Sequence, residues 1–292
     1  MQAITVASEG AAPAPQEIEP RTPGAGEVLV RVQASSINPL DGGVAAGMLA
    51  QMGLPYEYPV TLGRDFAGVV EQVGEGVTSI AVGDEVFGEV SAFNPPVRDG
   101  AWAERIVVGE QFFTKKPEVV DTAQAGAAPL VTLTALATVD ALELSSGQTV
   151  VVVGATGGVG SIVVQLAKAA GATVIAPALP EDEEYLRGLG VDALVDLVTP
   201  TSRPRSTACS PRVGAWRRRP TPPAGPGRTN VSHGESLNRE GLERVAGLLA
   251  DGTIRIPIQQ TYELAQAPEA LGALNGGHTQ GKLALRVSEV QS

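Results

Sequence analysis

Apolar and polar residues alternate along three segments in the first third of the chain. These segments are residues 27–33 (EVLVRVQ), 66–74 (FAGVVEQVG) and 84–90 (DEVFGEV). A period of two is typical of strands that have one exposed face. Turn residues separate the segments, in stretches such as PGAGE, GEGV and NPPVRDG. The pattern predicts an all-β, barrel-like region from Met1 to about Val120.

The pattern changes from Thr122 onwards, where apolar residues take helical spacing in AQAGAAPLVTLTALATVDAL. The following sequence predicts an apolar strand over 149–153, a helix over 161–170, a second strand over 171–176 and a helix over 181–190. Strands and helices that alternate in this way predict a parallel sheet.

The last part of the chain combines one helix with two strands. The helix is predicted to begin at an N-cap, Ser236, and to end at the stop signal Asp251-Gly252. Strand alternation then returns in TIRIPI (253–258) and KLALRV (282–287), and we expect these strands to rejoin the first region.

We therefore predict an α/β fold with two lobes. Residues 1–121 form a β-rich lobe, residues 122–253 form a parallel-sheet lobe, and residues 254–292 return to the first lobe.

Composition and charge restrict the possible functions. The formal net charge of −11 and the pI near 4.7 disfavour binding to nucleic acid, which depends on clustered Lys and Arg. The single cysteine, Cys209, excludes an intramolecular disulfide and a multi-cysteine zinc site. Neither a leader-like N-terminus nor a run of roughly 18 apolar residues is present, so we expect a soluble cytoplasmic protein without a membrane segment.

A glycine turn lies between the strand and the helix of residues 150–176. Gly157 and Gly160 occupy the second and third glycine places of the dinucleotide-binding fingerprint, and Ala155 takes the first. The alternative is a turn used only for packing, but the flanking strand and helix favour binding. Amide groups at the start of the helix would then face a pyrophosphate.

The residues after the second strand do not distinguish NAD from NADP. NAD sites usually place Asp or Glu about 20 residues beyond the glycine motif, whereas NADP sites need a cation or hydroxyls for the extra phosphate. Here Pro177, Ala178, Leu179 and Pro180 precede the acidic run 181–184, and neither requirement is met.

Several segments together resemble the zinc-independent quinone oxidoreductases of the medium-chain dehydrogenase/reductase superfamily. They are SSINPLD, GRDFAGVVEQVGEGV, VGDEVFG, GAWAERIVV, LTALATVDAL, GATGGVGSIVVQLAKAAGA and GHTQGKLALRV, in that order. The resemblance implies a GroES-like catalytic lobe and a Rossmann lobe with a doubly wound sheet. It also implies hydride transfer from NADPH, with NADH not excluded, to a quinone or an α,β-unsaturated carbonyl.

The resemblance also implies roles for particular residues. Asn38 matches an asparagine beside the nicotinamide and is the catalytic candidate, and Thr134 matches a hydroxyl beside the cofactor. Their alternative roles are an Asx-turn before Pro39 and a hydrogen bond to a helix carbonyl. The predicted cofactor-binding residues are Asn38, Thr134, Gly154, Ala155, Thr156, Gly157, Gly158, Val159, Gly160 and Ala178.

The sequence offers no clear metal ligands and no clear general acid. Zinc-bearing relatives have Gly-His-Glu where this chain has Gly63-Arg64-Asp65, so we expect no metal. A tyrosine that many members place shortly after the asparagine is missing from DGGVAAG. Asp41 could assist or cap a turn, and Tyr56 or Tyr58 could reach the pocket, so no general acid is assigned. We expect His233 and His278 to be exposed loop residues, and Trp102 to serve packing.

Residues 199–230 depart from every pattern around them, with seven arginines, seven prolines and no acidic residue. They could be a basic binding arm or a disordered linker. A local reading-frame shift is a third hypothesis, because one possible encoding of STACSPRVGAWRRR gives DGLLAPRGGVAAS, an apolar helix end, a glycine turn and a strand, when read from its third base. VDALVDLV (191–198) would then be a later strand of the family fold, and the Rossmann lobe would be truncated.

The sequence thus favours an NADPH-dependent, zinc-independent reductase acting on a small quinone or enone. The alternatives are an enoyl-thioester reductase, a catalytically impaired scaffold with weak nucleotide binding and, more remotely, an RNA-binding arm within 203–228. The resemblance implies a homodimer.

Overall fold

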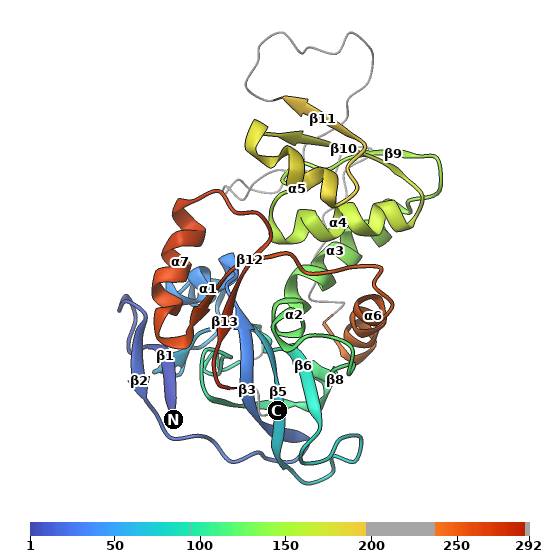
Figure 1. Cartoon of the computed structure of the whole chain (residues 1–292). Coiled ribbons are helices and arrows are strands. Elements are labelled where there is room, and N and C mark those ends of the chain that lie inside the picture. The colour runs from blue at the N-terminus through green and yellow to red at the C-terminus, as the bar shows by residue number, and fades with distance from the viewer. Residues whose placement is uncertain (94, 197–236, 290–292) are drawn as a thin grey trace.

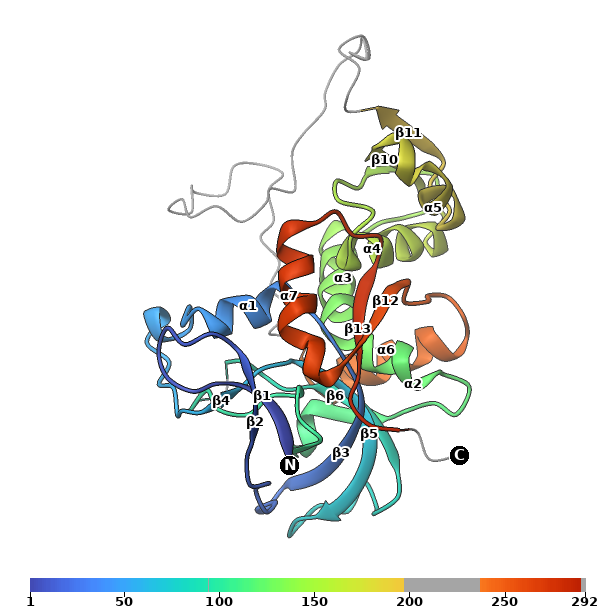
Figure 2. The same ribbon diagram turned by 60° about the vertical axis from the view of Figure 1, so that its left-hand side comes forward.

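Two large structural units, one β-rich and one with a parallel sheet, are visible in Figures 1 and 2. The computed structural model describes residues 1–93, 95–196 and 237–289. Within these residues strands and helices are both abundant, which confirms the α/β fold. None of the described helices is both long and apolar enough to cross a bilayer.

The β-rich unit contains a sheet of seven strands in the described chain. The strand order is β12-β13-β3-β5-β6-β8, and β7 also pairs with β3. A smaller sheet beside it has the order β2-β1-β4. The strands are β1 (Gln2–Val6), β2 (Ala14–Glu17), β3 (Glu27–Ser36), β4 (Val60–Thr61), β5 (Asp65–Val73), β6 (Glu85–Glu89), β7 (Arg105–Gly109), β8 (Phe113–Lys115), β12 (Ile258–Glu263) and β13 (Lys282–Arg286).

The strand β3 is more buried than its alternating sequence predicts. All of its residues except Glu27 and Arg31 are buried. The reason is the helix α2 (Thr122–Ala127), which packs directly on β3: a Cβ added to Gly126 would lie 2.8 Å from backbone and side-chain atoms of Ala34. The predicted half-exposed strand is therefore covered on both faces.

The strand β13 returns to the first sheet as predicted. It runs antiparallel to β3, with Ala284 opposite Ser36 and Leu285 opposite Ser35. The other predicted strand is wrong in position, because TIRIPI is not a strand and β12 begins only at Ile258. Ile254 and Ile256 are buried in the core next to the helices, so their alternation reflects packing outside a sheet.

The second unit is built on a parallel sheet of β9 (Thr149–Val151), β10 (Thr173–Ala178) and β11 (Ala193–Asp196). The described strands have the order β11-β10-β9, and both pairings are parallel. In a doubly wound sheet the third strand lies beside the second, on the side away from the first. The position of β11 is therefore that of the third strand, and the interpretation of 191–198 as a later strand is wrong.

Helices join this sheet to the β-rich unit. The helix α4 (Gly158–Ala169) packs on β10, and α3 (Pro129–Leu142) packs between α4 and the strands β5 and β6. The helix α5 (Glu183–Gly188) follows β10, and α6 (Arg239–Ala250) packs on α3 and β8. The helix α7 (Ala267–Gly276) packs on β12 and β13, with α1 (Pro39–Ala45) beside it. Short 3-10 helices occupy 50–52, 110–112, 180–182 and 264–266. One hydrophobic core runs from α2 through α3 and α4 to β10, so the two units share buried contacts.

The start of α6 differs from the prediction. Asn238 caps this helix by accepting a hydrogen bond from the Gly241 N–H at 2.9 Å, so the predicted N-cap at Ser236 is wrong. The atypical segment 199–230 and its frame-shift hypothesis lie outside the described residues. They stay predictions, as do the domain boundaries 1–121, 122–253 and 254–292. The predicted truncation assumed a missing unit just before residues 191–198, so it loses its basis when β11 takes the place of the third strand.

Candidate functional site

A cavity of about 420 Å³ lies where the two units meet. The glycine turn between β9 and α4 forms one wall, and α1 and the start of β13 contribute to the other. Most of the lining is apolar. The polar side chains along it belong to Asn38, Thr138, Thr279 and Lys282. A long apolar crevice with a few fixed polar groups is typical of a cofactor or substrate site.

Two glycines of the turn, Gly154 and Gly160, stand where a larger residue would be strained or would clash. Gly154 has a φ of +78°, a conformation that favours glycine, and its carbonyl accepts a hydrogen bond from the Gly157 N–H at 3.1 Å. A Cβ on Gly160 would lie 2.0 Å from the same carbonyl oxygen. A Cβ on Gly157 would meet only that oxygen, at 3.6 Å. Gly160 is therefore needed for packing, whereas Gly157 leaves its backbone open to an approaching group.

A short strap, residues 278–282, runs along the glycine turn. The Gly281 N–H donates to the Thr156 carbonyl at 2.7 Å, and Gly157 and Gly281 form an isolated parallel bridge. The next residue, Lys282, begins β13 and reaches into the β-rich unit. The strap thus ties the turn to the lobe that carries Asn38.

Asn38 is fully buried, and protein groups fix both ends of its amide. Its Nδ2 donates to Asp65 Oδ2 at 2.8 Å, and its Oδ1 accepts from Lys282 Nζ at 2.5 Å. The Asn38 N–H donates to Asp41 Oδ2 at 2.7 Å, just before α1 begins at Pro39. In this contact the Asn38 backbone donates and the Asp41 side chain accepts, so it is a helix cap made by Asp41 and not the predicted Asx-turn of Asn38. An amide oxygen has two lone pairs, so Oδ1 can still accept one hydrogen bond from a ligand.

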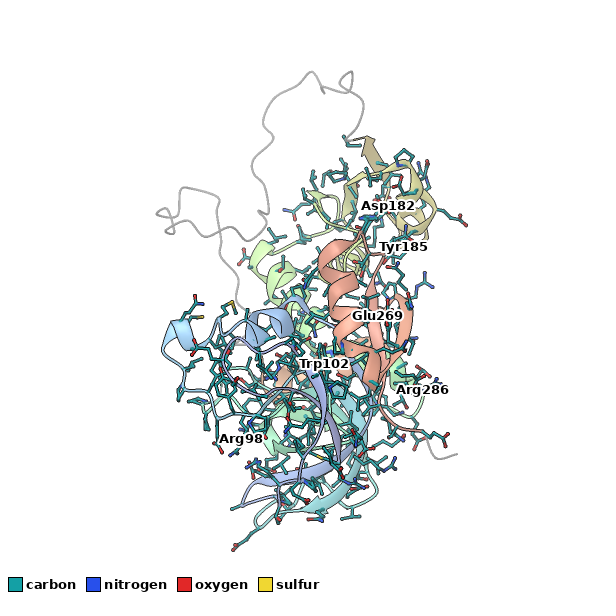
Figure 3. All side chains as sticks on the ribbon, turned by 90° about the vertical axis from the view of Figure 1, so that its left-hand side faces the viewer. Arg98, Trp102, Asp182, Tyr185, Glu269 and Arg286 are labelled. Carbon is teal, nitrogen blue, oxygen red and sulfur yellow. The ribbon has the colours of Figure 1, made fainter. Side chains whose placement is uncertain are left out.

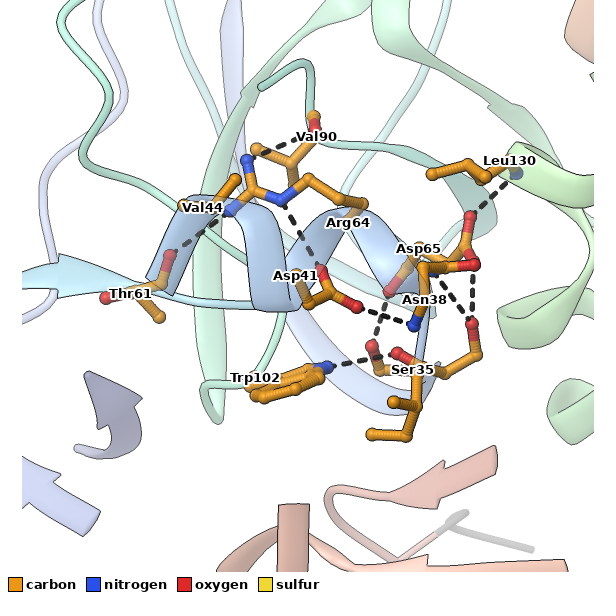
Figure 4. A network of polar contacts seen from close by, with 12 residues as sticks. Ser35, Asn38, Asp41, Val44, Thr61, Arg64, Asp65, Val90, Trp102 and Leu130 are labelled. Atoms are coloured by element: carbon orange, nitrogen blue, oxygen red, sulfur yellow. Dashed lines mark hydrogen bonds and ion pairs between the residues drawn. The ribbon is translucent and has the colours of Figure 1, made fainter. Parts of the chain in front are cut away.

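Asp65 is the centre of this buried network (Figure 4). Its Oδ2 accepts hydrogen bonds from Ser36 Oγ at 2.6 Å and from Asn38, and its Oδ1 accepts one from the Leu130 N–H at 2.8 Å. Lys282 Nζ lies 3.7 Å from Oδ2. Since Leu130 belongs to α3, the carboxylate links the start of that helix to Asn38.

Lys282 is the functional residue that sequence reasoning missed, although it stands in the quoted stretch GHTQGKLALRV. Its side chain is 4% exposed, and Nζ also donates to the Ile37 carbonyl at 3.0 Å. Burial lowers the pKa of Lys282, and the charges of Asp65 and Asp41 offset part of this effect. Nothing in the local pattern marks it, because its partner Asn38 is 244 residues away.

Asp41 and Arg64 extend the network away from the cavity. The Arg64 Nε lies 3.8 Å from Asp41 Oδ1, and the terminal nitrogen Nη2 donates to the Thr61 carbonyl (Figure 4). The same nitrogen donates to the Asp99 carbonyl at 3.0 Å. Burial raises the pKa of Asp41 to about 7, while Arg64 and the Asn38 N–H offset part of the rise. Because Asp41 Oδ2 accepts a hydrogen bond from the Asn38 N–H, Asp41 caps the start of α1, which is one of its two predicted roles.

The raised pKa of Asp41 predicts a pH-dependent stability. The folded chain keeps a proton that the unfolded chain releases between its ordinary pKa of 3.8 and about 7. The free energy of unfolding should therefore fall as pH rises through this window, by about 1.4 kcal/mol per pH unit, and level off above it. When urea unfolding is measured at several pH values, Asp41→Asn should not show this fall in the free energy of unfolding. Glu118→Gln, which alters an exposed carboxyl, is the matched control. An unchanged slope in Asp41→Asn contradicts the prediction.

The predicted cofactor residues are only partly brought together. Asn38, Gly154, Gly157, Gly158, Val159 and Gly160 line the cavity. Ala155 is buried under the turn, and Thr156 contacts the strap through its carbonyl. Ala178 is buried at the end of β10. Thr134 donates its hydroxyl to the Leu130 carbonyl at 2.7 Å, which is its alternative role, and Thr138 lines the cavity instead.

The other candidate side chains take structural positions. Tyr56 donates to the Val44 carbonyl and packs near Tyr58, and neither residue lines the cavity, so the idea that they reach it is wrong. Trp102 is buried and donates to the Ser36 carbonyl, which confirms packing. His278 is 45% exposed in its loop but pairs with Asp182. His233 and Cys209 lie outside the described residues.

Comparison with known proteins decides the family. Residues 24–118 match the family described as alcohol dehydrogenase GroES-like domain, and residues 119–285 match the one described as zinc-binding dehydrogenase. The chain belongs to the medium-chain dehydrogenase/reductase superfamily. The predicted GroES-like and Rossmann-like lobes are thereby confirmed.

Relatives within the superfamily include oxidoreductases. The chain is 39% identical over 174 residues to the chloroplastic NADPH-dependent alkenal/one oxidoreductase of Arabidopsis thaliana, covering 58% of this chain and 45% of that protein. It is 28% identical over 327 residues to the human mitochondrial NAD(P)H oxidoreductase RTN4IP1, covering 89% and 82%. The quinone oxidoreductase structure from Pseudomonas syringae pv. Tomato DC3000 superposes with a TM-score of 0.81 at 25% identity, covering 98% and 99%. The chain spans about half the length of the first curated relatives it matches.

The zinc in one family description does not fit this dehydrogenase/reductase site. Among the described residues no three His, Cys, Asp or Glu side chains gather in a way that could hold a metal ion. The place of the histidine in Gly-His-Glu is taken by Arg64, whose guanidinium lies beside Asp41, and Lys282 adds a second buried cation. A nicotinamide dinucleotide fits better, because the open backbone at Gly157 faces the same cavity as Asn38.

Proposed function

We propose that this chain is an NADPH-dependent, zinc-independent reductase that transfers a hydride to a quinone or an α,β-unsaturated carbonyl. One observation carries the proposal: a single apolar cavity joins the glycine turn to the buried amide of Asn38. The names of relatives support the substrate class, since they include an alkenal/one oxidoreductase and quinone oxidoreductases.

The chain's own groups would bind and orient the reactants. The first residues of α4 line the cavity, and the dipole at the N-terminus of a helix favours a pyrophosphate there. Asn38 Oδ1 keeps one lone pair for the carboxamide of the nicotinamide, and Lys282 and Asp65 prevent the amide from rotating. The coenzyme, when bound, supplies the hydride. The apolar lining excludes water and holds the acceptor close to the ring, which is how positioning accelerates a reaction without a metal.

Neither tyrosine nor histidine lines this cavity in the described chain, which favours an alternative: a scaffold that binds coenzyme without turnover. An enoyl-thioester reductase is the alternative within enzymes. Coenzyme choice, the cytoplasmic location and the homodimer also stay predictions.

Rapid mixing of the purified chain with NADPH and an acceptor tests the proposal. The expected result is loss of nicotinamide absorbance that depends on a simple benzoquinone or an enone and is slower with an enoyl thioester. Calorimetric titration with NADPH accompanies it. Binding without acceptor-dependent oxidation would support the scaffold alternative, and absence of both would contradict the proposed site.

A further inference from the structure

Reduction of a quinone or an enone consumes a proton as well as a hydride, so the side chains along the cavity were compared as proton donors. The polar ones belong to Asn38, Thr138, Thr279 and Lys282. Lysine is among the side chains that transfer protons in catalysis, whereas amides and threonine hydroxyls are not. Among the described residues that line the cavity, Lys282 is therefore the candidate donor.

Lys282 is the first residue of β13, at the end of the strand that lies beside the glycine turn. A Cβ added to Gly158 would lie 2.9 Å from the Lys282 Cδ, so the lysine stem packs on the start of α4. Figure 3 places Arg286, the last residue of β13, on the β-rich unit and well away from Tyr185 of the parallel-sheet unit. The lysine side chain thus reaches from the glycine turn to the amide of Asn38.

The ammonium of Lys282 has three hydrogens, and two of them are held by short hydrogen bonds. Nζ donates to Asn38 Oδ1 at 2.5 Å and to the Ile37 carbonyl at 3.0 Å. Its third neighbour, Asp65 Oδ2, lies 3.7 Å away. That separation exceeds the roughly 2.7–3.2 Å of an ordinary N–H···O hydrogen bond. The third hydrogen is therefore left for the oxygen of a molecule in the cavity.

We propose that Lys282 is the general acid of the reaction and protonates the oxygen of the acceptor. This inference rests on the proposed function. When a hydride from the coenzyme adds to the β-carbon of an enone, the electron pair of the carbon–carbon double bond moves toward the carbonyl oxygen. An O–H bond then forms as one N–H bond of the ammonium breaks, and the enol product rearranges to the saturated ketone. A quinone takes up a hydride and a proton in the same way and becomes a hydroquinone.

The surroundings of Lys282 suit this transfer. Burial lowers the pKa of Lys282 from its ordinary value of 10.5, and the charges of Asp65 on β5, Asp41 on α1 and Glu89 on β6 offset part of this effect. A lower pKa makes the ammonium a stronger acid near neutral pH. The amine that remains keeps two N–H groups for its two short hydrogen bonds. Its acidic neighbours favour the return of the proton from water once the product has left.

Lys282→Arg tests the inference, because a guanidinium keeps a buried positive charge but does not release a proton in proteins. NADPH oxidation is measured with cyclohexenone and with a dichlorobenzoquinone, whose reduced anion is stabilised by its chlorine atoms and depends less on an acid. The ratio of the enone rate to the quinone rate should fall at least about a hundredfold. A merely structural lysine would lower both rates alike. Lys115→Arg, at an exposed lysine that pairs with Asp84, is the matched control and should leave the ratio unchanged.

The pH dependence of the wild-type chain gives a second measurement. A general acid must carry its proton, so the enone rate should fall as pH rises through the pKa of Lys282. This fall should lie below pH 10.5, because burial lowers that pKa, and it should be much smaller with the dichlorobenzoquinone.

Binding of p-nitrophenol gives a readout without turnover, because its phenolate resembles the anion that hydride addition produces. The absorbance of the phenolate shows the pH at which the bound phenol ionises. This pH should be lower in the wild-type chain than in Lys282→Met, because the ammonium stabilises the bound anion.

The outcomes separate the two proposals. An unchanged rate ratio in Lys282→Arg, with wild-type-like thermal unfolding, overturns this inference and leaves the proposed function standing. If Lys282→Arg does not fold, the wild-type pH profiles decide, and equal pH dependence with both acceptors overturns the inference. A wild-type chain that oxidises NADPH with neither acceptor contradicts the proposed function, and this inference with it.

Discussion

Replacing Gly160 with alanine is expected to lower the free energy of unfolding by about 3 kcal/mol or more and to abolish coenzyme binding. The added Cβ would lie 2.0 Å from the Gly154 carbonyl oxygen and 2.9 Å from the Ala155 Cα. Both are backbone atoms, so the turn or the start of α4 must move. Urea unfolding measures the stability, and calorimetric titration with NADPH measures the binding.

Gly157→Ala is the matched variant for this experiment. Gly157 has a φ of −76°, which alanine adopts readily, and its added Cβ would meet only the Gly154 oxygen at 3.6 Å. The stability should fall by no more than about 1 kcal/mol, the scale of a change at a helix N-cap. Affinity for NADPH should nevertheless fall at least about tenfold, because the methyl group keeps the pyrophosphate away from the backbone. Undiminished affinity would show that the turn serves packing alone.

Replacing Lys282 with methionine is expected to lower the free energy of unfolding by about 3 to 5 kcal/mol, the scale of removing one partner from a buried charge pair. Methionine keeps much of the apolar stem, so the loss reports the ammonium group. Asp65 would lose its nearby cation, and the Asn38 oxygen would lose its donor at 2.5 Å. Acceptor reduction should fall more than NADPH affinity, because the amide of Asn38 becomes free to rotate.

Two further variants make the Lys282 result specific. Adding Asp65→Asn should restore at least about 1 kcal/mol of the lost stability, because the uncompensated carboxylate is then gone. Arg286→Met removes the exposed partner of Glu263 at the other end of β13 and should cost less than about 1 kcal/mol. Equal losses in Lys282→Met and Arg286→Met would contradict the role given to the buried network.

The glycine turn shows how far local sequence carries the prediction. Its flanking strand and helix, and the packing role of Gly160, depend on neighbours within a few residues. Backbone conformation and short contacts of this kind are encoded in the local order of residues. For the same reason β3, β5, β6, α4 and β10 lie close to their predicted ranges.

Predictions from the sequence are wrong or incomplete where tertiary packing determines the surroundings of a residue. TIRIPI alternates like a strand, yet Ile254 and Ile256 are buried beside helices, and periodicity alone does not say which surface covers a residue. Thr134 matched a family position, and its hydroxyl donates to the preceding turn of its own helix, so its role beside the cofactor stays a prediction. His278 was expected to be only a loop residue, and its partner Asp182 lies 96 residues before it in the chain.

The sequence by itself determined the alternation of strands and helices, the phosphate-binding shape of the glycine turn and the superfamily resemblance, because each depends on residues close together in the chain. Only the tertiary structure decided that Lys282 holds Asn38, that Asp65 joins α3 to that amide, and that the strap reaches Asp182. Such contacts form when distant segments share one core. Their partners are selected by burial, since a charge or amide removed from water must find its hydrogen bonds wherever the folded chain offers them.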